Sequence, residues 1–331
     1  MKREDYEKHK PFAGEKKPSM LRRRLDHDYE SRRIYLITMT VEGRRPLLGR
    51  LVGNADAPEG SLDEPRVELS QLGEEVQRCW LSIPDFYPEV KPLALQLMPD
   101  HLHGILFVTR QMEQHLGLVL KGFKTGCNKA YRQLFRAATM LPQRDTGFLF
   151  SRNYNDHILE GDGELERWMK YLRDNPRRLA MKRSRPEFLR VKENVNICGR
   201  LCSSVGNLAL LSAPRKLRVR ISRSMDPALL EQEKARLLAA AREGAVLVSP
   251  AISPGEKQIT RAAFDEGLPL IILLENGLHP LSKPGPERFR ACSEGRLLLL
   301  SPFPHHNERI TITRAACEAL NGLSWDISGG K

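Results

Sequence analysis

Two histidines separated by one residue are the first side chains that could do chemistry. His101 and His103 flank Leu102, directly after a Pro-Asp turn that ends an apolar segment. Residues i and i+2 of a strand point to the same face, so both imidazoles would share one face of a sheet. Two imidazoles held side by side make half of a divalent-metal site. The alternative is two polar residues near a turn, since such a motif is only a hypothesis by itself.

A second polar motif, Tyr171-Leu172-Arg173-Asp174-Asn175-Pro176, follows about seventy residues later. On a helix, Tyr171 and Asn175 are one turn apart and face the same place. Pro176 disfavours helical geometry at the preceding residue, so we expect the helix to end or kink there. Asn175 could add an amide ligand to a metal held by the two histidines, and the Tyr171 hydroxyl could act as a nucleophile.

Together these side chains suit the cleavage of a phosphodiester. Mg²⁺ or Mn²⁺, the expected ion, would polarise a phosphate oxygen and stabilise charge in the transition state. Attack of the Tyr171 oxygen on a DNA phosphorus would give a 5′-phosphotyrosine and a free 3′-hydroxyl. Because that linkage conserves bond energy, the break could be rejoined to another end.

The elements that position these residues can be read from the periodicity of apolar side chains. The β-rich segment Ile34–Val41 and the apolar segment Leu93–Met98 predict strands. Residues 69–81 predict a helix, and another helix begins at about Gly163. Apolar residues at spacings of three and four between Leu116 and Leu134 predict the clearest amphipathic helix.

A second stripe of that amphipathic helix is basic. We expect a backbone-binding track for nucleic acid there and beyond the tyrosine motif, because cations close to phosphates supply most of the affinity for DNA. The alternative is an ordinary solvated face. The residues predicted to bind DNA are Lys121, Lys124, Arg132, Arg136, Arg177 and Arg178.

The charge of the chain is concentrated in its first part. The 331 residues carry a net charge of +12, and residues 231–331 contain 12 basic and 12 acidic side chains, so residues 1–230 carry all of the excess. A basic first part beside a neutral second part suggests a polyanion partner, with simple solubility as the alternative. No apolar run approaches the ~20 residues of a membrane span, and no signal-peptide core precedes the first strand. The six scattered cysteines fit reduced thiols in a cytoplasmic protein.

The chain divides into four predicted regions. Residues 1–30 are charged, poor in apolar residues and expected to be disordered. Residues 31–190 would form the first domain, and the weak pattern over 191–214 suggests a linker. Over 215–328, strands and helices alternate, which predicts a parallel α/β domain.

The second domain contains a short internal sequence repeat. Each copy has a strand, a Ser-Pro pair, a loop and a helix expected to begin with Thr-Arg. Ends of parallel strands and helix N-termini are common phosphate sites, although two similar turns without a ligand would give the same pattern. The residues predicted to hold a phosphate or nucleotide are Ser249, Thr260, Arg261, Ser301, Thr313 and Arg314.

Met-Pro-Asp-His-Leu-His-Gly followed by Tyr-Leu-Arg-Asp-Asn-Pro resembles the single-tyrosine HUH transposases, and most of all the REP-associated tyrosine transposases. The resemblance covers roughly residues 31–185. It implies a ferredoxin-like α+β core, metal binding by His101, His103 and Asn175, and nucleophilic attack by Tyr171. It also implies hairpin-forming single-stranded DNA as the partner. Asp100 stands where this family commonly has Asn, at a turn position that either residue suits.

The second domain resembles, more loosely, the Rossmann-like domain of the DNA-processing protein A family, which binds single-stranded DNA. The matching pieces include residues 244–249, 270–277, 295–301 and 314–324, and Ser-Pro stands where that family has Ser-Gly. We therefore expect an α/β accessory domain behind an enzyme that cleaves and rejoins DNA and is compatible with a homodimer. Two alternatives remain: a domesticated protein that binds structured DNA without cutting, and a nucleotide sensor acting through the second domain.

Overall fold

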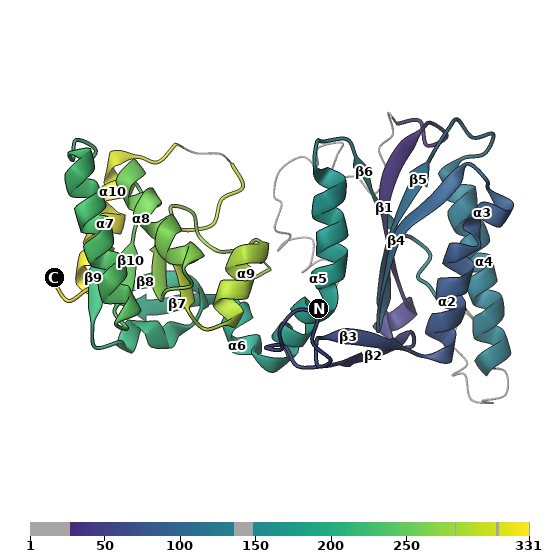
Figure 1. Ribbon diagram of the computed structural model, residues 1–331, viewed down its shortest axis with the longest axis horizontal. Coiled ribbons are helices and arrows are strands. Elements are labelled where there is room, and N and C mark those ends of the chain that lie inside the picture. The colour runs from purple at the N-terminus through teal and green to yellow at the C-terminus, as the bar shows by residue number, and fades with distance from the viewer. Residues whose placement is uncertain (1–26, 136–147, 282, 309–310, 331) are drawn as a thin grey trace. The chain divides into compact units, whose positions relative to one another are not determined.

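The structure is a computed structural model that describes residues 27–135, 148–281, 283–308 and 311–330. The chain forms two compact units that meet within the last turn of one helix, between Met181 and Lys182. We describe each unit by itself (Figure 1). Of the segment 1–30, for which disorder was predicted, residues 1–26 lie outside the described residues and residues 27–30 are described.

The N-terminal unit is built on an antiparallel sheet with the order β4-β5-β1-β6. Its strands are β1 (Arg33–Thr40), β4 (Val90–Met98), β5 (His101–Val108) and β6 (Asn155–Leu159). Strands 4 and 5 are joined by the Pro99-Asp100 turn, as the sequence predicted. The register pairs Thr38 with His103 and Thr40 with His101, so the start of β5 lies beside the end of β1.

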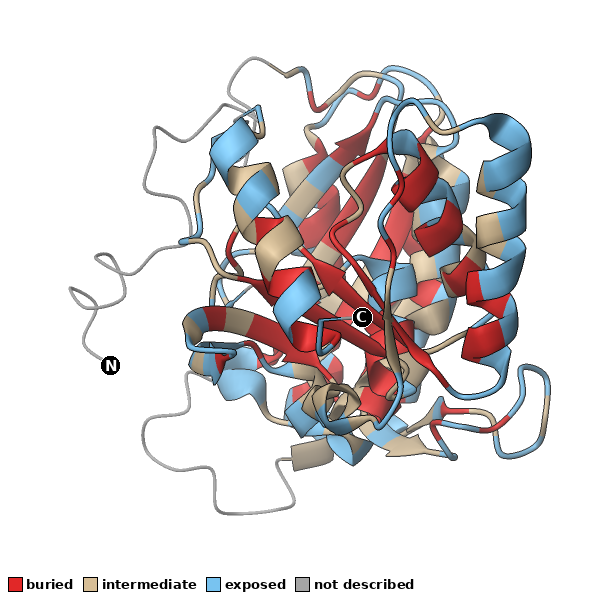
Figure 2. Cartoon of the chain, turned by 90° about the vertical axis from the view of Figure 1, so that its left-hand side faces the viewer, coloured by how far each residue is buried: buried red, intermediate tan, exposed pale blue. Residues whose placement is uncertain are grey.

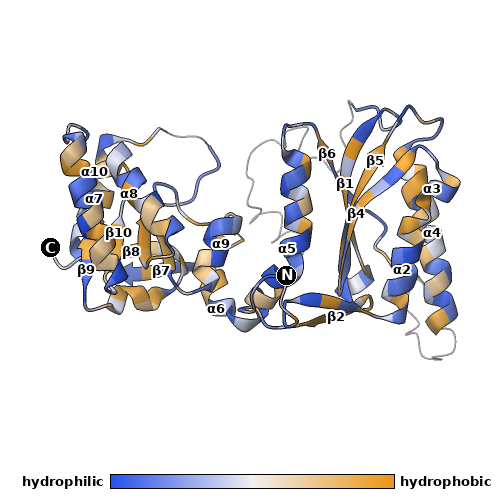
Figure 3. Cartoon of the chain, viewed as in Figure 1, coloured by the Kyte–Doolittle hydropathy of each residue, from blue (hydrophilic) through white to orange (hydrophobic). Residues whose placement is uncertain are grey.

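Helices cover both faces of this sheet (Figure 1). On one face, α2 (Gln71–Leu81) and α4 (Leu116–Phe135) pack on alternate residues of the strands, including Leu102 and Leu106. On the other face lies α5 (Glu164–Ser184), a mostly hydrophilic helix (Figure 3), which buries a smaller cluster that includes Leu172 and Ile105. The strand period of two therefore sends His101 and His103 to the α5 face.

Gly104 allows α2 to approach the sheet closely. A Cβ built on Gly104 would lie 2.2 Å from the Trp80 ring, which is a distance that packed atoms do not tolerate. The buried Trp80 of α2 thus packs directly on the backbone of β5, next to the histidines on the opposite face. Close packing against Trp80 therefore explains why a glycine follows the two histidines.

Smaller elements complete the unit. The 3-10 helix η2 (Glu42–Arg44) follows β1, the hairpin β2 (Gly49–Val52) and β3 (Arg66–Leu69) precedes α2, and the short helix α3 (Ile83–Phe86) follows it. The sequence analysis did not predict this hairpin, because the intervening loop is long and its strands have only four residues each.

The C-terminal unit is built on a six-stranded sheet with the order β7-β8-β12-β11-β10-β9. Its elements are α6 (Pro186–Leu189), β7 (Lys192–Ile197), β8 (Arg200–Gly206), η3 (Leu208–Ser212), β9 (Lys216–Arg218), α7 (Pro227–Arg242), β10 (Val246–Ser249), α8 (Pro254–Asp265), β11 (Leu270–Leu273), α9 (Pro286–Ser293), β12 (Leu297–Ser301) and α10 (Arg314–Ile327). Strands 9 to 12 are parallel, as predicted for this region, whereas β7 and β8 add an antiparallel edge. Its strands are mostly buried, while its helices show buried and exposed residues side by side (Figure 2).

One sequence-based expectation is wrong, and one of the two alternatives predicted for Pro176 is excluded. Residues 191–214 are not a linker, because β7 and β8 pair with each other and β8 pairs with β12. The alternation over β8 was obscured by its serines, of which Ser204 is nevertheless buried in the sheet. Helix α5 also does not end at Pro176 but continues to Ser184, because packing of its buried face outweighs the local cost of a proline.

The chain as a whole is a mixed α/β protein with antiparallel strand pairs in both units. All six cysteines are free thiols. None of the helices in the described ranges is long and apolar enough to cross a membrane.

Candidate functional site

The two histidines lie side by side at the start of β5. Their ring centroids are 5.0 Å apart and the rings are nearly perpendicular, at 86°. Leu102 between them is fully buried on the opposite face of the sheet, which fixes the direction of both side chains. The rigid β4-β5 pairing thus delivers two imidazoles to one place.

Each imidazole is held through its Nδ1 atom. The Nδ1–H of His101 donates to the Asp100 carboxylate over 2.6 Å, because a carboxylate can only accept. Nδ1 of His103 lies 2.8 Å from the Thr38 hydroxyl on β1. No hydrogen bond is made by either Nε2 atom to any residue that the structure describes. Bonding at one ring nitrogen leaves the other as a ligand atom, which is the usual arrangement of metal-binding histidines.

Burial keeps His103 neutral. Desolvation, assisted by the neighbouring His101, lowers the pKa of His103 to about 4. A neutral imidazole keeps one proton, and when His103 Nδ1 carries it and donates to the Thr38 hydroxyl, the lone pair of Nε2 is available to a cation.

Tyr171 faces the histidines from α5. Its ring centroid lies 5.8 Å from that of His103, and Trp168 packs against it edge-on at 5.2 Å. The guanidinium of Arg178 lies 5.6 Å from the centre of the Tyr171 ring. The tyrosine helix therefore packs against the histidine strand.

Asn175 is one helical turn beyond Tyr171 and is buried, with 8% of its surface exposed. Its amide Nδ2 is buried without a hydrogen-bond partner in the structure. An unsatisfied buried polar atom costs about 1–3 kcal/mol and calls for an explanation. Since the oxygen and nitrogen of an amide are assigned rather than observed, the orphaned atom could equally be the oxygen.

These observations fit a divalent ion on two imidazoles and one amide. Across the described part of the chain, no cluster of three or more His, Cys, Asp and Glu side chains could hold a metal. The Asn175 amide would supply a third ligand, with water or substrate oxygens completing the shell. Mg²⁺ and Mn²⁺ accept such a set and usually keep several waters.

The residues predicted to bind DNA have different environments. Lys121 and Arg132 are exposed and have no side-chain bond to any described residue. Lys124 is partly buried and donates to the carbonyls of Ser151 and Arg152. Arg178 lies over Tyr171, and Arg136 lies outside the described residues.

Arg177 has a structural partner that the sequence did not reveal. It donates to the carbonyls of Ala55 and Ala57 and pairs with Glu64 at 3.1 Å, so it fastens α5 to the loop between β2 and β3. Only 18% of its side chain is exposed. Its guanidinium is therefore already bonded to other parts of the fold.

Most of the residues predicted to hold phosphate in the C-terminal unit are likewise buried or already bonded to other residues. Ser249 and Thr260 are buried and bond to each other. The expectation that Thr260 leads a helix is wrong, because α8 begins at Pro254 with Ser253 as its cap. Of the others, Arg261 pairs with Asp265 and Glu287, Ser301 is buried, Thr313 caps α10, and Arg314 pairs with Glu318.

Two residues of the site were missed as participants. Asp100 was interpreted only as a turn residue, although its carboxylate binds both His101 and, at 3.2 Å, Arg44. Thr38 gave no signal, because its contact with His103 depends on strand pairing across 65 residues. The adjacency of Asp100 and His101 was the one local cue.

Comparisons with known proteins give a distant likeness. No protein-family model matches the chain. A Haemophilus influenzae protein, described as uncharacterized, is 26% identical over 165 residues, covering 46% of this chain and 86% of that protein. The single-stranded-DNA-binding DNA processing protein A of Helicobacter pylori is 19% identical in sequence, with a TM-score of 0.32, over 42% of this chain and 66% of that one. A REP-associated tyrosine transposase bound to a REP hairpin is 11% identical, with a TM-score of 0.29, over 45% of this chain and 70% of that one.

Proposed function

We propose that this protein is a metal-dependent enzyme that cleaves and rejoins single-stranded, hairpin-containing DNA through Tyr171. The observation that carries the proposal is the pair of histidines with bonded Nδ1 atoms and free Nε2 atoms beside a tyrosine ring. The unsatisfied amide of Asn175 on the same helix supports it. The motif resemblance to HUH single-tyrosine transposases agrees with this chemistry.

In the proposed reaction, the Tyr171 oxygen attacks a DNA phosphorus and loses its proton. The bond between phosphorus and the 3′-oxygen breaks, and that oxygen leaves as a 3′-hydroxyl after taking up a proton. Rejoining reverses these steps with another 3′-hydroxyl. A bound divalent ion would polarise the phosphate and neutralise developing charge. Asp100 and Thr38 orient the imidazoles, and the guanidinium of Arg178 lies over the Tyr171 ring.

We assign the N-terminal unit to the ferredoxin-like α+β class. Its strand-helix-strand-strand-helix-strand order and its β4-β5-β1-β6 sheet support that assignment. We assign the C-terminal unit to the Rossmann-like α/β class, on the strength of its four parallel strands with helices between them.

We also propose that the C-terminal unit is an accessory module for single-stranded DNA or a nucleotide phosphate. A pocket of about 400 Å³ lies at the carboxyl ends of β10 and β11 and is lined by Lys257 and Arg288. Neither cation pairs with a carboxylate of the described residues. Such a site would be local, because the net charge of residues 231–331 is zero.

The cleavage proposal is tested with a hairpin oligonucleotide library labelled at the 5′ side and, separately, at the 3′ side. With Mn²⁺ the protein should form a covalent adduct with the 5′-phosphate side and release a fragment that ends in a 3′-hydroxyl. EDTA should abolish both products. Tight hairpin binding without any adduct would instead favour the non-cleaving binding protein, a reading compatible with the lack of a larger His and carboxylate cluster in the described ranges.

A further inference from the structure

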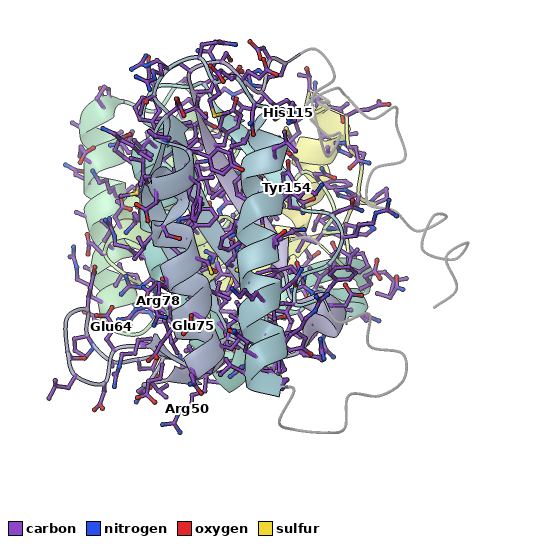
Figure 4. The ribbon with its side chains drawn as sticks, turned by 90° about the vertical axis from the view of Figure 1, so that its right-hand side faces the viewer. Arg50, Glu64, Glu75, Arg78, His115 and Tyr154 are labelled. Carbon is purple, nitrogen blue, oxygen red and sulfur yellow. The ribbon has the colours of Figure 1, made fainter. Side chains whose placement is uncertain are left out.

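A pocket of about 660 Å³ lies in the N-terminal unit between α4 and the segment 148–154. Its size falls within the range of small-molecule sites. Tyr154, one of its lining residues, lies beside α4 toward the end of the helix marked by His115 and away from Arg50 (Figure 4). The pocket is on the α4 side of the sheet, whereas Tyr171 and the histidines are on the α5 side.

Aromatic side chains form one part of the lining. Phe148 lines the pocket and is 50% exposed. Phe150 lies deeper and stacks on Phe123 at 6.0 Å. Tyr154 completes the set. Flat π faces at the mouth of a cavity suit another flat ring.

Cations form a second part of the lining. The Lys124 ammonium is held by the carbonyls of Ser151 and Arg152 and lies 5.8 Å from the centre of the Tyr154 ring. The side chains of Lys121 and Arg152 bond to no described residue. Two other exposed arginines of this unit pair with carboxylates: Arg78 with Glu75 (Figure 4) and Arg50 with Glu68.

Polar groups that could read an edge of a ring form a third part. Asn128 uses its Oδ1 to accept from the Leu149 N–H, which orients the amide and leaves its Nδ2 as a donor. Glu42, which carries a carboxylate, also lines the pocket. A donor and an acceptor beside aromatic faces and unpaired cations match a nucleotide: a base with polar edges and a phosphate with negative charge.

The register of the strands connects this pocket to the histidines. Val41, the residue after β1, forms an isolated antiparallel bridge with Phe150 of the pocket. The Val41 N–H donates to the Asp100 carbonyl. Since Asp100 precedes His101, the pocket and the candidate site flank the same end of β1.

We propose that this pocket takes one unpaired, unstacked base of single-stranded DNA, with Lys121 and Arg152 on the flanking phosphates. The proposal rests on the substrate class of the proposed function, but not on the chemistry of Tyr171. Stacking of a base on an aromatic side chain stabilises a bound strand whatever its sequence, because every base has a π face. The Phe148 ring is the platform on which discrimination between a base and no base depends.

The test uses fluorescence anisotropy of the full chain with two labelled probes: twelve thymidine nucleotides, and an abasic strand of the same length and charge. The wild-type protein should bind the thymidine strand at least about fivefold more tightly than the abasic one. Phe148→Ala should bring the two affinities together while leaving abasic binding unchanged. Phe86→Ala, at a phenyl group that is 76% exposed on α3 outside the pocket, is the matched control and should behave as wild type.

Lys121→Gln should weaken the binding of both probes by similar factors, because the Lys121 side chain is proposed to contact phosphate and not base. The proposal that the pocket takes a base would be overturned if the wild-type protein bound both probes equally. It would also be overturned if Phe148→Ala kept the wild-type preference for the thymidine strand. An adduct through Tyr171 is measured separately with hairpins. The pocket can therefore fail while cleavage stands, and cleavage can fail while the pocket stands.

Discussion

Asp100 is the residue whose role changes most between sequence and structure. A carboxylate that accepts from the Nδ1–H of His101 over 2.6 Å fixes the ring tautomer and makes Nε2 a better ligand. Asp100→Asn keeps the turn and an acceptor oxygen but removes the charge. We expect its Mn²⁺ affinity, measured by calorimetry, to fall about tenfold or more. Asp85→Asn on α3 is the control, and equal affinities of Asp100→Asn and wild type would contradict the assignment.

The lowered pKa of His103 predicts how the free energy of unfolding depends on pH. Its pKa is about 4 in the folded protein and 6.5 as a free group, so below pH 6.5 the unfolded chain binds a proton that the folded chain does not. Stability contributed above pH 6.5 is therefore lost as pH falls toward 4, by about 2 kcal/mol between pH 6.5 and 5. Urea unfolding in EDTA at these two pH values measures the loss. His103→Gln should show a clearly smaller loss over the same interval.

That interval stays above the range where carboxylates titrate. Hydrogen bonds from the Gly161 N–H and from His157 lower the pKa of Glu164 to about 2. Its contribution is present above pH 4.5 and is lost only below it. A wild-type slope no steeper than that of His103→Gln would show that His103 is not buried and neutral as described.

At the scale of elements, Arg177 links α5 to the loop between β2 and β3. Arg177→Met removes a buried cation from two carbonyls and Glu64, and should destabilise the protein by about 1–3 kcal/mol. Hydrogen exchange should become faster over residues 54–64, with little change in DNA affinity. Arg173→Met, at an exposed position of the same helix, is the control. A large loss of DNA affinity in Arg177→Met with unchanged exchange would support the original interpretation of Arg177 as a DNA contact.

The elements that the sequence predicted are those with strong local periodicity. The helix from Leu116 and the strands around the Pro99-Asp100 turn were predictable because their apolar spacing matches α4, β4 and β5. The hairpin β2-β3 and the strand β8 were not, because their stability comes from pairing with distant segments. A helix end at Pro176, one of the two alternatives predicted, does not occur because tertiary packing continues α5 past that residue.

The candidate site divides in the same way. The shared face of His101 and His103 and the turn between Tyr171 and Asn175 follow from periods of two and 3.6 residues. The partners Thr38 and Asp100, the aromatic contact of Trp168 and the orphaned amide require the folded arrangement. No local pattern could have revealed that Ser249 and Thr260 are buried against each other.

At the scale of the whole molecule, the excess of positive charge lies in residues 1–230. Binding of single strands should weaken with salt, and each lost phosphate contact should lower the log-log slope by about 0.7. Lys121→Gln and Arg132→Gln should each lower it by that amount. Lys234→Gln, whose ammonium already pairs with Glu231 in the C-terminal unit, should not. Equal slopes for all four proteins would mean that the basic face of α4 is only solvated.

The most direct test of the whole account is the identity of the residue that carries the DNA. Wild-type protein, incubated with Mn²⁺ and a cleavable hairpin, is digested and its adduct is located by mass spectrometry. We predict a phosphodiester on Tyr171, no adduct in Tyr171→Phe, and unchanged hairpin affinity in that variant because only a hydroxyl is lost. Tyr87→Phe should form the adduct as wild type does. An adduct that persists in Tyr171→Phe, or that maps to Tyr131 or Tyr154, would contradict the account.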